Sequence, residues 1–451
     1  MIFNGKSVKI FKILIEQCNN MKKNIKNLSY MFFVQMANYV FPLITIPIVA
    51  RIFGPEKLGL INYIAAIVGY FSLVVSYSFN FTGVRRVTRE KNSSNQIFST
   101  IFTSQMLLIS ISMAIFAICI FTIGDLKNNI ALALITFCSC LSLLFTQTWF
   151  LQAYSDFKTI ALLSFVSKSA SCILIVVLIK SPDDILLYAA ILNVITLITA
   201  IITFGIIISK YRVKLRFAPI KDCIRYLKED RHLFLSSVVT NLYTTTGIVL
   251  LGAISTKQDV GYYSSAQKLI EVAKSVMIMP VYQIIFPILS EKFGRDKNEG
   301  VETVKKIMPI FICMSLMMLI GMITFSKLAT LIIFGKAFLP SAPIVVILSF
   351  GLFAVFYGII IGGQVMLNMG LDKVFVKIQI IVSVFSLTAN YLILPYGGGL
   401  TTATIWTVSE FAISLYQYIV LKRMGIILID RDTFKLSSLS VALRYLTKRD
   451  S

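Results

Sequence analysis

Apolar runs long enough to cross a membrane follow one another along almost the whole chain. A helix of about 20 apolar residues matches a hydrocarbon core of roughly 30 Å. The mean hydropathy of +0.82 and the charged fraction of 14% lie far from the values of a soluble domain. About twelve such runs occur, at 28–51, 58–83, 97–123, 129–151, 157–179, 185–209, 232–254, 261–289, 307–326, 341–367, 374–394 and 400–421. The sequence therefore predicts an all-α polytopic membrane protein.

The positions of the basic residues predict the orientation and the organisation of the chain. Of the 43 Lys and Arg residues, 33 lie on one side of the predicted spans and seven on the other. Cytoplasmic loops carry the excess of basic residues, so both termini are expected in the cytoplasm. This bias and an affinity for anionic lipids explain the net charge of +22, and no nucleic-acid partner is expected. The predicted parts are a basic N-terminal tail (1–27), an N-lobe of six spans (28–209), a basic connector (210–231), a C-lobe of six spans (232–421) and a basic C-terminal tail (422–451).

The two halves of the chain resemble each other weakly. A shift of 202 residues places Gly59 on Gly261, each preceded by an acidic residue, Glu56 and Asp259. Chance similarity between apolar segments is the alternative explanation. If the repeat is real, two bundles of six spans are related by an axis along the membrane normal, as in many transporters.

Three of the 43 basic residues, Lys168, Lys268 and Lys274, fall inside predicted spans. A charge inside a membrane is costly and usually faces a cavity or a partner, so these lysines are the first functional candidates. Glu271 lies between two of them, and Glu410 is an isolated acid in the last predicted span.

No residue pattern points to a metal, a cofactor or direct use of ATP. The seven cysteines show no spacing typical of a zinc site or a disulfide framework. The one histidine, His232, lies beside a basic loop, and no phosphate-binding glycine-rich loop is present. Together with the absence of a long outer loop, this argues against an enzyme.

Several short segments carry a family resemblance. They are 35–39 (QMANY), 51–59 (RIFGPEKLG), 79–86 (FNFTGVRR), 149–152 (WFLQ) and 260–264 (VGYYS). As a set they resemble the Wzx-type O-antigen flippases of the polysaccharide transporter family, and the likeness runs from about Met21 to the twelfth predicted span. One departure follows Gln152, where the family pattern has a glycine and then an acid. Here the nearest acid is Asp156.

The resemblance implies a fold and a substrate. The fold would be that of the multidrug, oligosaccharidyl-lipid and polysaccharide exporters, with two six-helix lobes around a central cavity. The substrate would be an O-antigen or other polysaccharide repeat unit on undecaprenyl pyrophosphate, moved from the cytoplasmic to the periplasmic leaflet of a bacterial inner membrane by alternating access coupled to an ion gradient. Inner-membrane lipids, the polysaccharide polymerase and a chain-length regulator would be its partners.

This substrate suggests three roles for polar side chains. A pyrophosphate needs fixed cations to offset its desolvation. The candidates for the headgroup are Lys168, Lys268, Lys274, Arg51, Arg85 and Arg86. The candidates for sugar contacts are Gln35, Asn38, Tyr39, Asn62, Tyr63, Tyr70, Tyr77 and Asn241. Glu271 and Glu410 are candidates for ion coupling or an internal ion pair.

Structural roles are open for several of these residues. Arg85 and Arg86 also suit membrane anchors, and Arg51 and Lys268 could extend to the interface. Glu410 could equally be a packing acid kept protonated by burial.

Two rival functions also stay open. One is a multidrug-type exporter, which would favour acids over lysines in its cavity. The other is a polysaccharide polymerase or acyltransferase, which the missing catalytic pattern disfavours.

Overall fold

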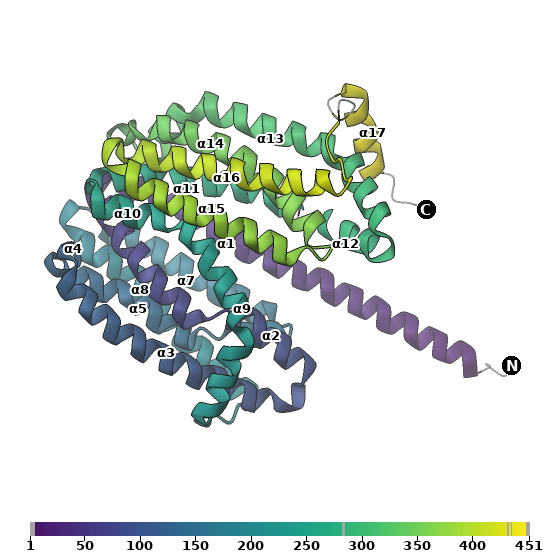
Figure 1. Cartoon of the computed structure of the whole chain (residues 1–451). Coiled ribbons are helices and arrows are strands. Elements are labelled where there is room, and N and C mark those ends of the chain that lie inside the picture. The colour runs from purple at the N-terminus through teal and green to yellow at the C-terminus, as the bar shows by residue number, and fades with distance from the viewer. Residues whose placement is uncertain (1–4, 282–284, 431–432, 434, 448–451) are drawn as a thin grey trace. The chain divides into compact units, whose positions relative to one another are not determined.

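The structure is a computed structural model that describes residues 5–281, 285–430, 433 and 435–447. The part of the chain described is helical almost throughout and contains no β-strand (Figure 1). The first helix, α1 (Gly5–Ser76), contains most of the predicted N-terminal tail, whose side chains lie outside the described part.

Helices of spanning length confirm the prediction of a multi-pass membrane protein. By length and composition, eight stretches of the described chain can cross a membrane, and the bent pair α9 (Ile220–Thr244) and α10 (Thr246–Ile254) makes a possible ninth. The first of the eight, Ser29–Arg89, contains two predicted spans. They are separated at Gly54 (φ 67°), where the backbone of α1 departs from helical geometry. Two further predicted spans coincide with α11 (Lys257–Pro280) and α16 (Gly398–Arg423). Helical chain therefore exists at each of the twelve predicted positions.

The remaining helices follow in chain order. They are α2 (Phe79–Arg89), α3 (Ser94–Thr122), α4 (Gly124–Asn128), α5 (Ile130–Phe145), α6 (Thr148–Ala153), α7 (Phe157–Leu178), α8 (Ile185–Lys210), α12 (Phe286–Arg295), α13 (Lys297–Ile333), α14 (Ser341–Gly358), the π-helix η5 (Ile359–Met366), α15 (Asp372–Ile393) and α17 (Leu436–Thr447).

The chain forms two compact units. The first unit comprises Met1–Ile48 and Val68–Phe234, and the second comprises Val49–Ile67 and Leu235–Ser451. The division passes through two helices. The end of the first predicted span and the start of the second, both in α1, belong to the second unit, and α9 changes unit at Phe234.

An aromatic core holds the first unit together. Trp149 and Phe150 of α6 pack against Phe98 of α3, with ring centroids 6.0 and 5.2 Å apart. A Cβ at Gly83 of α2 would lie 2.6 Å from the Trp149 ring, so only glycine allows this approach. The indole NH of Trp149 donates to Gln147, whose amide donates to Gln105. Two of the segments that carry the family resemblance, 79–86 and 149–152, therefore meet in one core.

Helix α14 lies at the centre of the second unit. It packs against α11, α13 and α16, which lie beside it in Figure 1. Thr407 and Ser414 of α16 donate hydrogen bonds to α14 carbonyl oxygens, at 2.9 and 2.7 Å. Trp406 fills the space that Gly351 leaves open. Polar residues can be buried within an apolar bundle when their hydroxyl groups donate hydrogen bonds to the backbone of a neighbouring helix.

Helices α1 and α11 approach each other closely at Gly59 and Gly261 in the second unit, and we call this contact the glycine crossing. A Cβ added to Gly59 would overlap the carbonyl oxygen of Lys257, and one added to Gly261 would overlap that of Pro55. Three residues further along each segment, Asn62 donates to Ser264 at 2.7 Å, across a separation of 202 residues. The same separation relates the members of all these pairs, so the two segments meet around a local two-fold axis. This contact supports the internal repeat that the sequence suggests.

Candidate functional site

A pocket with many hydroxyl groups surrounds Lys168 in the first unit. Its volume is about 230 Å³, and it is lined by residues of α1, α6, α7 and α8 together with Thr146, which follows α5. We call it the hydroxyl pocket. Its hydroxyl-bearing residues include Thr146, Ser164, Ser167, Thr196, Thr199 and Thr203.

Four threonines of the pocket donate their hydroxyl hydrogens to helix carbonyls. Thr196, Thr199 and Thr203, spaced three and four residues apart on α8, donate to the carbonyls of Leu192, Ile195 and Thr199 at 2.6 to 2.8 Å. Thr146 donates to Ser142 at 2.7 Å. A hydroxyl that donates to its own helix keeps its oxygen lone pairs for other partners. These threonines therefore act as hydrogen-bond acceptors.

Lys168 adds a positive charge near the middle of α7. It lies about 16 Å along the helix from Phe157 at 1.5 Å per residue. The side chain is exposed in the described structure and lines the pocket. The sequence prediction that this lysine faces a polar space is consistent with this position.

A second pair of charges, Lys274 and Glu410, lies within the second unit. Glu410 of α16 is only 7% exposed, on the helix face that also carries Thr407 and Ser414. Lys274 of α11 is half-buried and is the charged residue whose field acts on the Glu410 carboxyl. A buried acid near a cationic side chain can bind and release a proton or a cation.

Glu271 pairs with Lys268 instead of with Lys274. The Lys268 Nζ lies 3.3 Å from the Glu271 carboxylate, and both side chains are about half exposed. Exposed pairs of this kind contribute little to stability. Lys268 and Glu271 therefore form an ion pair of their own on α11.

Arg51 caps the C-terminal end of α13. Its guanidinium donates to the carbonyl of Ile332 at 2.7 Å, at the C-terminal turn of α13, and its side chain packs on Gly335. A cation at this end of a helix offsets the partial negative charge of the last carbonyls. The structure thus gives Arg51 a partner within the protein.

Arg86 belongs to an ion-pair cluster that sequence reasoning missed. It bonds to Asp230 at 2.7 Å and to Glu229 at 2.9 Å, and its guanidinium lies 4.0 Å from the Tyr226 ring centre. The Asp230 side chain is fully buried. The signal was available, because Glu229 and Asp230 are adjacent acids in the predominantly basic connector. Arg85, by contrast, is exposed.

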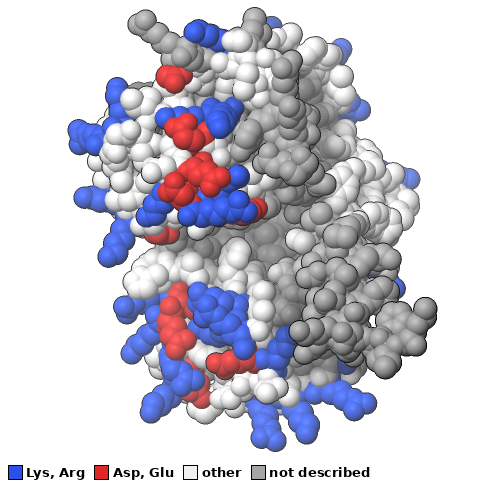
Figure 2. Space-filling model, turned by 90° about the vertical axis from the view of Figure 1, so that its right-hand side faces the viewer, with Lys and Arg blue, Asp and Glu red and all other residues white. Residues whose placement is uncertain are grey.

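Other basic residues of the predicted cytoplasmic side also have acidic partners. Figure 2 shows Lys and Arg gathered beside Asp and Glu on one face of the molecule. In the part of the second unit that the structure describes, ion pairs on this predicted side include Lys292 with Glu299, Arg295 with Glu291, and Lys305 with Glu302. The positive charge of this side is therefore partly neutralised within the chain.

Asp156, where the sequence departs from the family pattern, has a structural role. It accepts hydrogen bonds from Lys210 at 2.6 Å, Thr159 at 2.8 Å and Tyr211 at 3.0 Å. Burial alone would raise the pKa of Asp156, but these hydrogen bonds outweigh it and lower the pKa below its ordinary value. The acid therefore ties the start of α7 to the end of α8.

The structure places several predicted sugar contacts in helix packing. Tyr77 donates to the Leu227 carbonyl and stacks on Phe234 at 4.2 Å. Tyr63 is 2% exposed and fills the space beside Gly252. Asn62 belongs to the glycine crossing, and Asn241 donates to the carbonyl of Ser237.

The other predicted sugar contacts lie nearer the surface. Gln35 is exposed, and Asn38, Tyr39 and Tyr70 are half-buried. None of these four is among the residues that line the hydroxyl pocket. The structure therefore does not gather the predicted sugar contacts into one site within the described chain.

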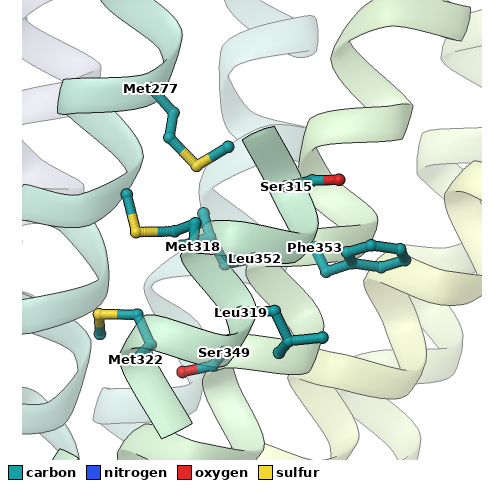
Figure 3. A pocket seen from close by; sticks show the side chains of 8 residues that line it. All are labelled: Met277, Ser315, Met318, Leu319, Met322, Ser349, Leu352 and Phe353. Atoms are coloured by element: carbon teal, nitrogen blue, oxygen red, sulfur yellow. The ribbon is translucent and has the colours of Figure 1, made fainter. Parts of the chain in front are cut away.

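Methionines line a narrow cleft in the second unit. Figure 3 shows Met277 of α11 and Met318 and Met322 of α13 around this space, with Phe353 of α14 on another side. The cleft has no room for a water molecule. Flexible thioether side chains adapt to irregular gaps, so this cleft is a packing contact and not a ligand site.

Comparison with known proteins places the chain in a family. A family model described as "Polysaccharide biosynthesis protein" matches residues 25–293, which is more than half of the chain. The chain belongs to this family. The residues that match the family model include the motifs in α1, α2 and α6.

Relatives of this member of the polysaccharide biosynthesis family occur in bacteria. It is 26% identical over 370 residues to the "Putative O-antigen transporter" of Escherichia coli (strain K12), covering 80% of this chain and 88% of the relative. It is 24% identical over 410 residues to the "Capsular polysaccharide biosynthesis protein CapF" of Staphylococcus aureus, covering 89% of this chain and all of the relative.

Solved structures share the fold. The lipid II flippase MurJ in an inward closed conformation matches with a TM-score of 0.71 and 17% identity, over 95% of this chain and 94% of MurJ. An inward-facing multidrug resistance transporter of the MATE family matches with a TM-score of 0.66 and 13% identity, over 94% of this chain and all of the transporter. The fold is therefore that of multi-span transporters with two lobes.

Proposed function

We propose that the protein is a flippase for polysaccharide repeat units linked to undecaprenyl pyrophosphate. It moves them from the cytoplasmic to the periplasmic leaflet of a bacterial inner membrane by alternating access. Family membership and the names of the relatives support a role in polysaccharide export, and the fold suits movement of a lipid-linked substrate. The observation that carries the proposal is a lysine at mid-depth among hydroxyl groups, since the cargo combines negative charge with sugar hydroxyls.

The same residues weigh against a multidrug exporter. A site for lipophilic cations favours acidic side chains, whereas Lys168 repels a cation by its own charge. The MATE likeness, at 13% identity, concerns the fold and not the cargo.

Deleting the gene is expected to strand undecaprenyl-linked repeat units in the inner leaflet and to remove the surface polysaccharide. A plasmid copy should restore the polysaccharide, and a copy with Lys274→Ala should not, because Lys274 is a half-buried cation within a predicted span of the second unit. Lipid extraction with leaflet-selective labelling, together with staining of the surface polymer, measures both effects.

The matched control is Lys268→Ala on the same helix, since Lys268 is exposed and paired with Glu271. It should restore the polymer as well as the wild-type copy does. Immunoblots of membrane fractions establish equal abundance of the variants. Polymer display without any copy of the gene would refute the proposed function.

Glu410 is proposed as the group that couples transport to an ion gradient. In Glu410→Gln the charge of the site can no longer change, while size and hydrogen-bonding capacity are nearly kept. Transport into inverted membrane vesicles should respond to a proton or sodium gradient in the wild type. It should lose that response in the variant, and wild-type transport that ignores both gradients would contradict the coupling.

A further inference from the structure

We propose that the hydroxyl pocket binds one sugar ring that carries a negative charge. This inference rests on the proposed function, because it assigns part of the cargo to a pocket in the first unit. Its size sets the first limit. The volume of about 230 Å³ is below the roughly 300–1,000 Å³ typical of sites for drug-sized ligands. The pocket can therefore hold one ring, but not a whole repeat unit.

The hydrogen-bonding groups of the pocket set the second limit. Thr146, Thr196, Thr199 and Thr203 donate to helix carbonyls and present acceptor oxygens. A ligand that satisfies several of them must carry several donors. A sugar ring carries several hydroxyl donors, whereas inorganic phosphate carries fewer donors and would place most of its oxygens against the lone pairs of these threonines.

The charge of Lys168 sets the third limit. Its ammonium can only donate, so the ligand must also carry acceptors. A charge-assisted hydrogen bond to a carboxylate or phosphate is roughly twice as strong as a bond to a neutral hydroxyl. A sugar with a negative group therefore fits better than a neutral sugar.

The position of the pocket agrees with delivery from the predicted cytoplasmic side. Ile160 and Thr203 of the lining lie within about 10 Å, along their helices, of the basic-side ends of α7 and α8. Lys168 lies deeper. A charged ring could thus enter from the side where the repeat unit is assembled and meet the ammonium at mid-depth.

Protection of an introduced cysteine tests this inference. The seven native cysteines are replaced and Ser164→Cys is added, so that an anionic methanethiosulfonate reports access to the pocket of the full-length protein in detergent. Glucuronate and glucose 1-phosphate are the charged probes, and glucose and inorganic phosphate are the comparisons. We expect one or both charged sugars to slow labelling at least fivefold, with at most twofold slowing by glucose or phosphate.

The two charged sugars distinguish the source of the negative group. Protection by glucuronate indicates an acidic sugar of the repeat unit, and protection by glucose 1-phosphate indicates the sugar next to the lipid phosphate. Lys168→Met should reduce the protection to the level of glucose. Asn92→Cys, in an exposed turn of the same unit, should be labelled at the same rate with every probe.

Several results would overturn the inference. They are equal protection by phosphate and the charged sugars, equal protection by glucose, no protection at all, or full protection in Lys168→Met. If Ser164→Cys does not fold, Ser167→Cys gives the same measurement. The gene-deletion result is independent of these outcomes, so the pocket assignment can fail while the flippase proposal stands, and the reverse also holds.

Discussion

Gly59→Ala and Gly261→Ala are each expected to destabilise the protein by about 3 kcal/mol. At both positions the added Cβ overlaps a backbone carbonyl oxygen of the opposite segment. A backbone atom cannot turn aside as a flexible side chain can, so the helices must separate and the Asn62 to Ser264 hydrogen bond must lengthen. Thermal unfolding of the purified protein in detergent measures the loss.

Gly69→Ala on α1 is the matched control, because a Cβ there meets nothing within 4 Å. In a helix interior alanine is preferred to glycine by roughly 0.5–1 kcal/mol, so this variant should be at least as stable as the wild type. An unchanged melting temperature in Gly59→Ala and Gly261→Ala would contradict the glycine crossing.

Arg86→Met and Asp230→Leu are each expected to destabilise the first unit by about 3–5 kcal/mol, because each removes one member of a buried ion pair, and the remaining member keeps at most the half-exposed Glu229 as a neighbour. The double variant should be markedly more stable than either single variant, since neither buried charge of the pair then remains to be desolvated. Chemical denaturation of the four proteins gives the coupling energy.

Glu229→Gln provides the control for this cycle. Glu229 bonds to the same guanidinium, but its side chain is 51% exposed, so its removal should change the stability by no more than about 1 kcal/mol. If Glu229→Gln were as harmful as Asp230→Leu, burial of Asp230 would not be the reason for the effect.

The fold could be predicted because the membrane imposes a simple rule on sequence. Each span must be a long apolar helix, and the predicted runs at 97–123, 157–179 and 185–209 agree closely with α3, α7 and α8. Local breaks were harder to predict. The π-helix at the end of α14 leaves no mark in hydropathy, because its residues are as apolar as those of α14.

The proposed site contains one residue that the sequence singles out and several that it does not. A lysine in an apolar run is conspicuous, and Lys168 was found in this way. The acceptors around it could not be found, because Thr196 and Thr203 bond to their own helix and look like ordinary membrane threonines. Arg51 finds its partner 281 residues away, and no local pattern reveals that contact. Arg86 finds its partner 144 residues away, where two adjacent acids in the connector were the only sequence signal.

Reconstitution tests the central claim most directly. Purified protein is placed in liposomes that contain a fluorescent undecaprenyl-pyrophosphate repeat unit in both leaflets, and a membrane-impermeant reductant quenches the outer leaflet. The account predicts that wild-type protein exposes the inner pool to the quencher, whereas Lys274→Ala protein and empty liposomes keep it protected. Equal protection of the inner pool with and without wild-type protein, under an imposed proton or sodium gradient, would contradict it.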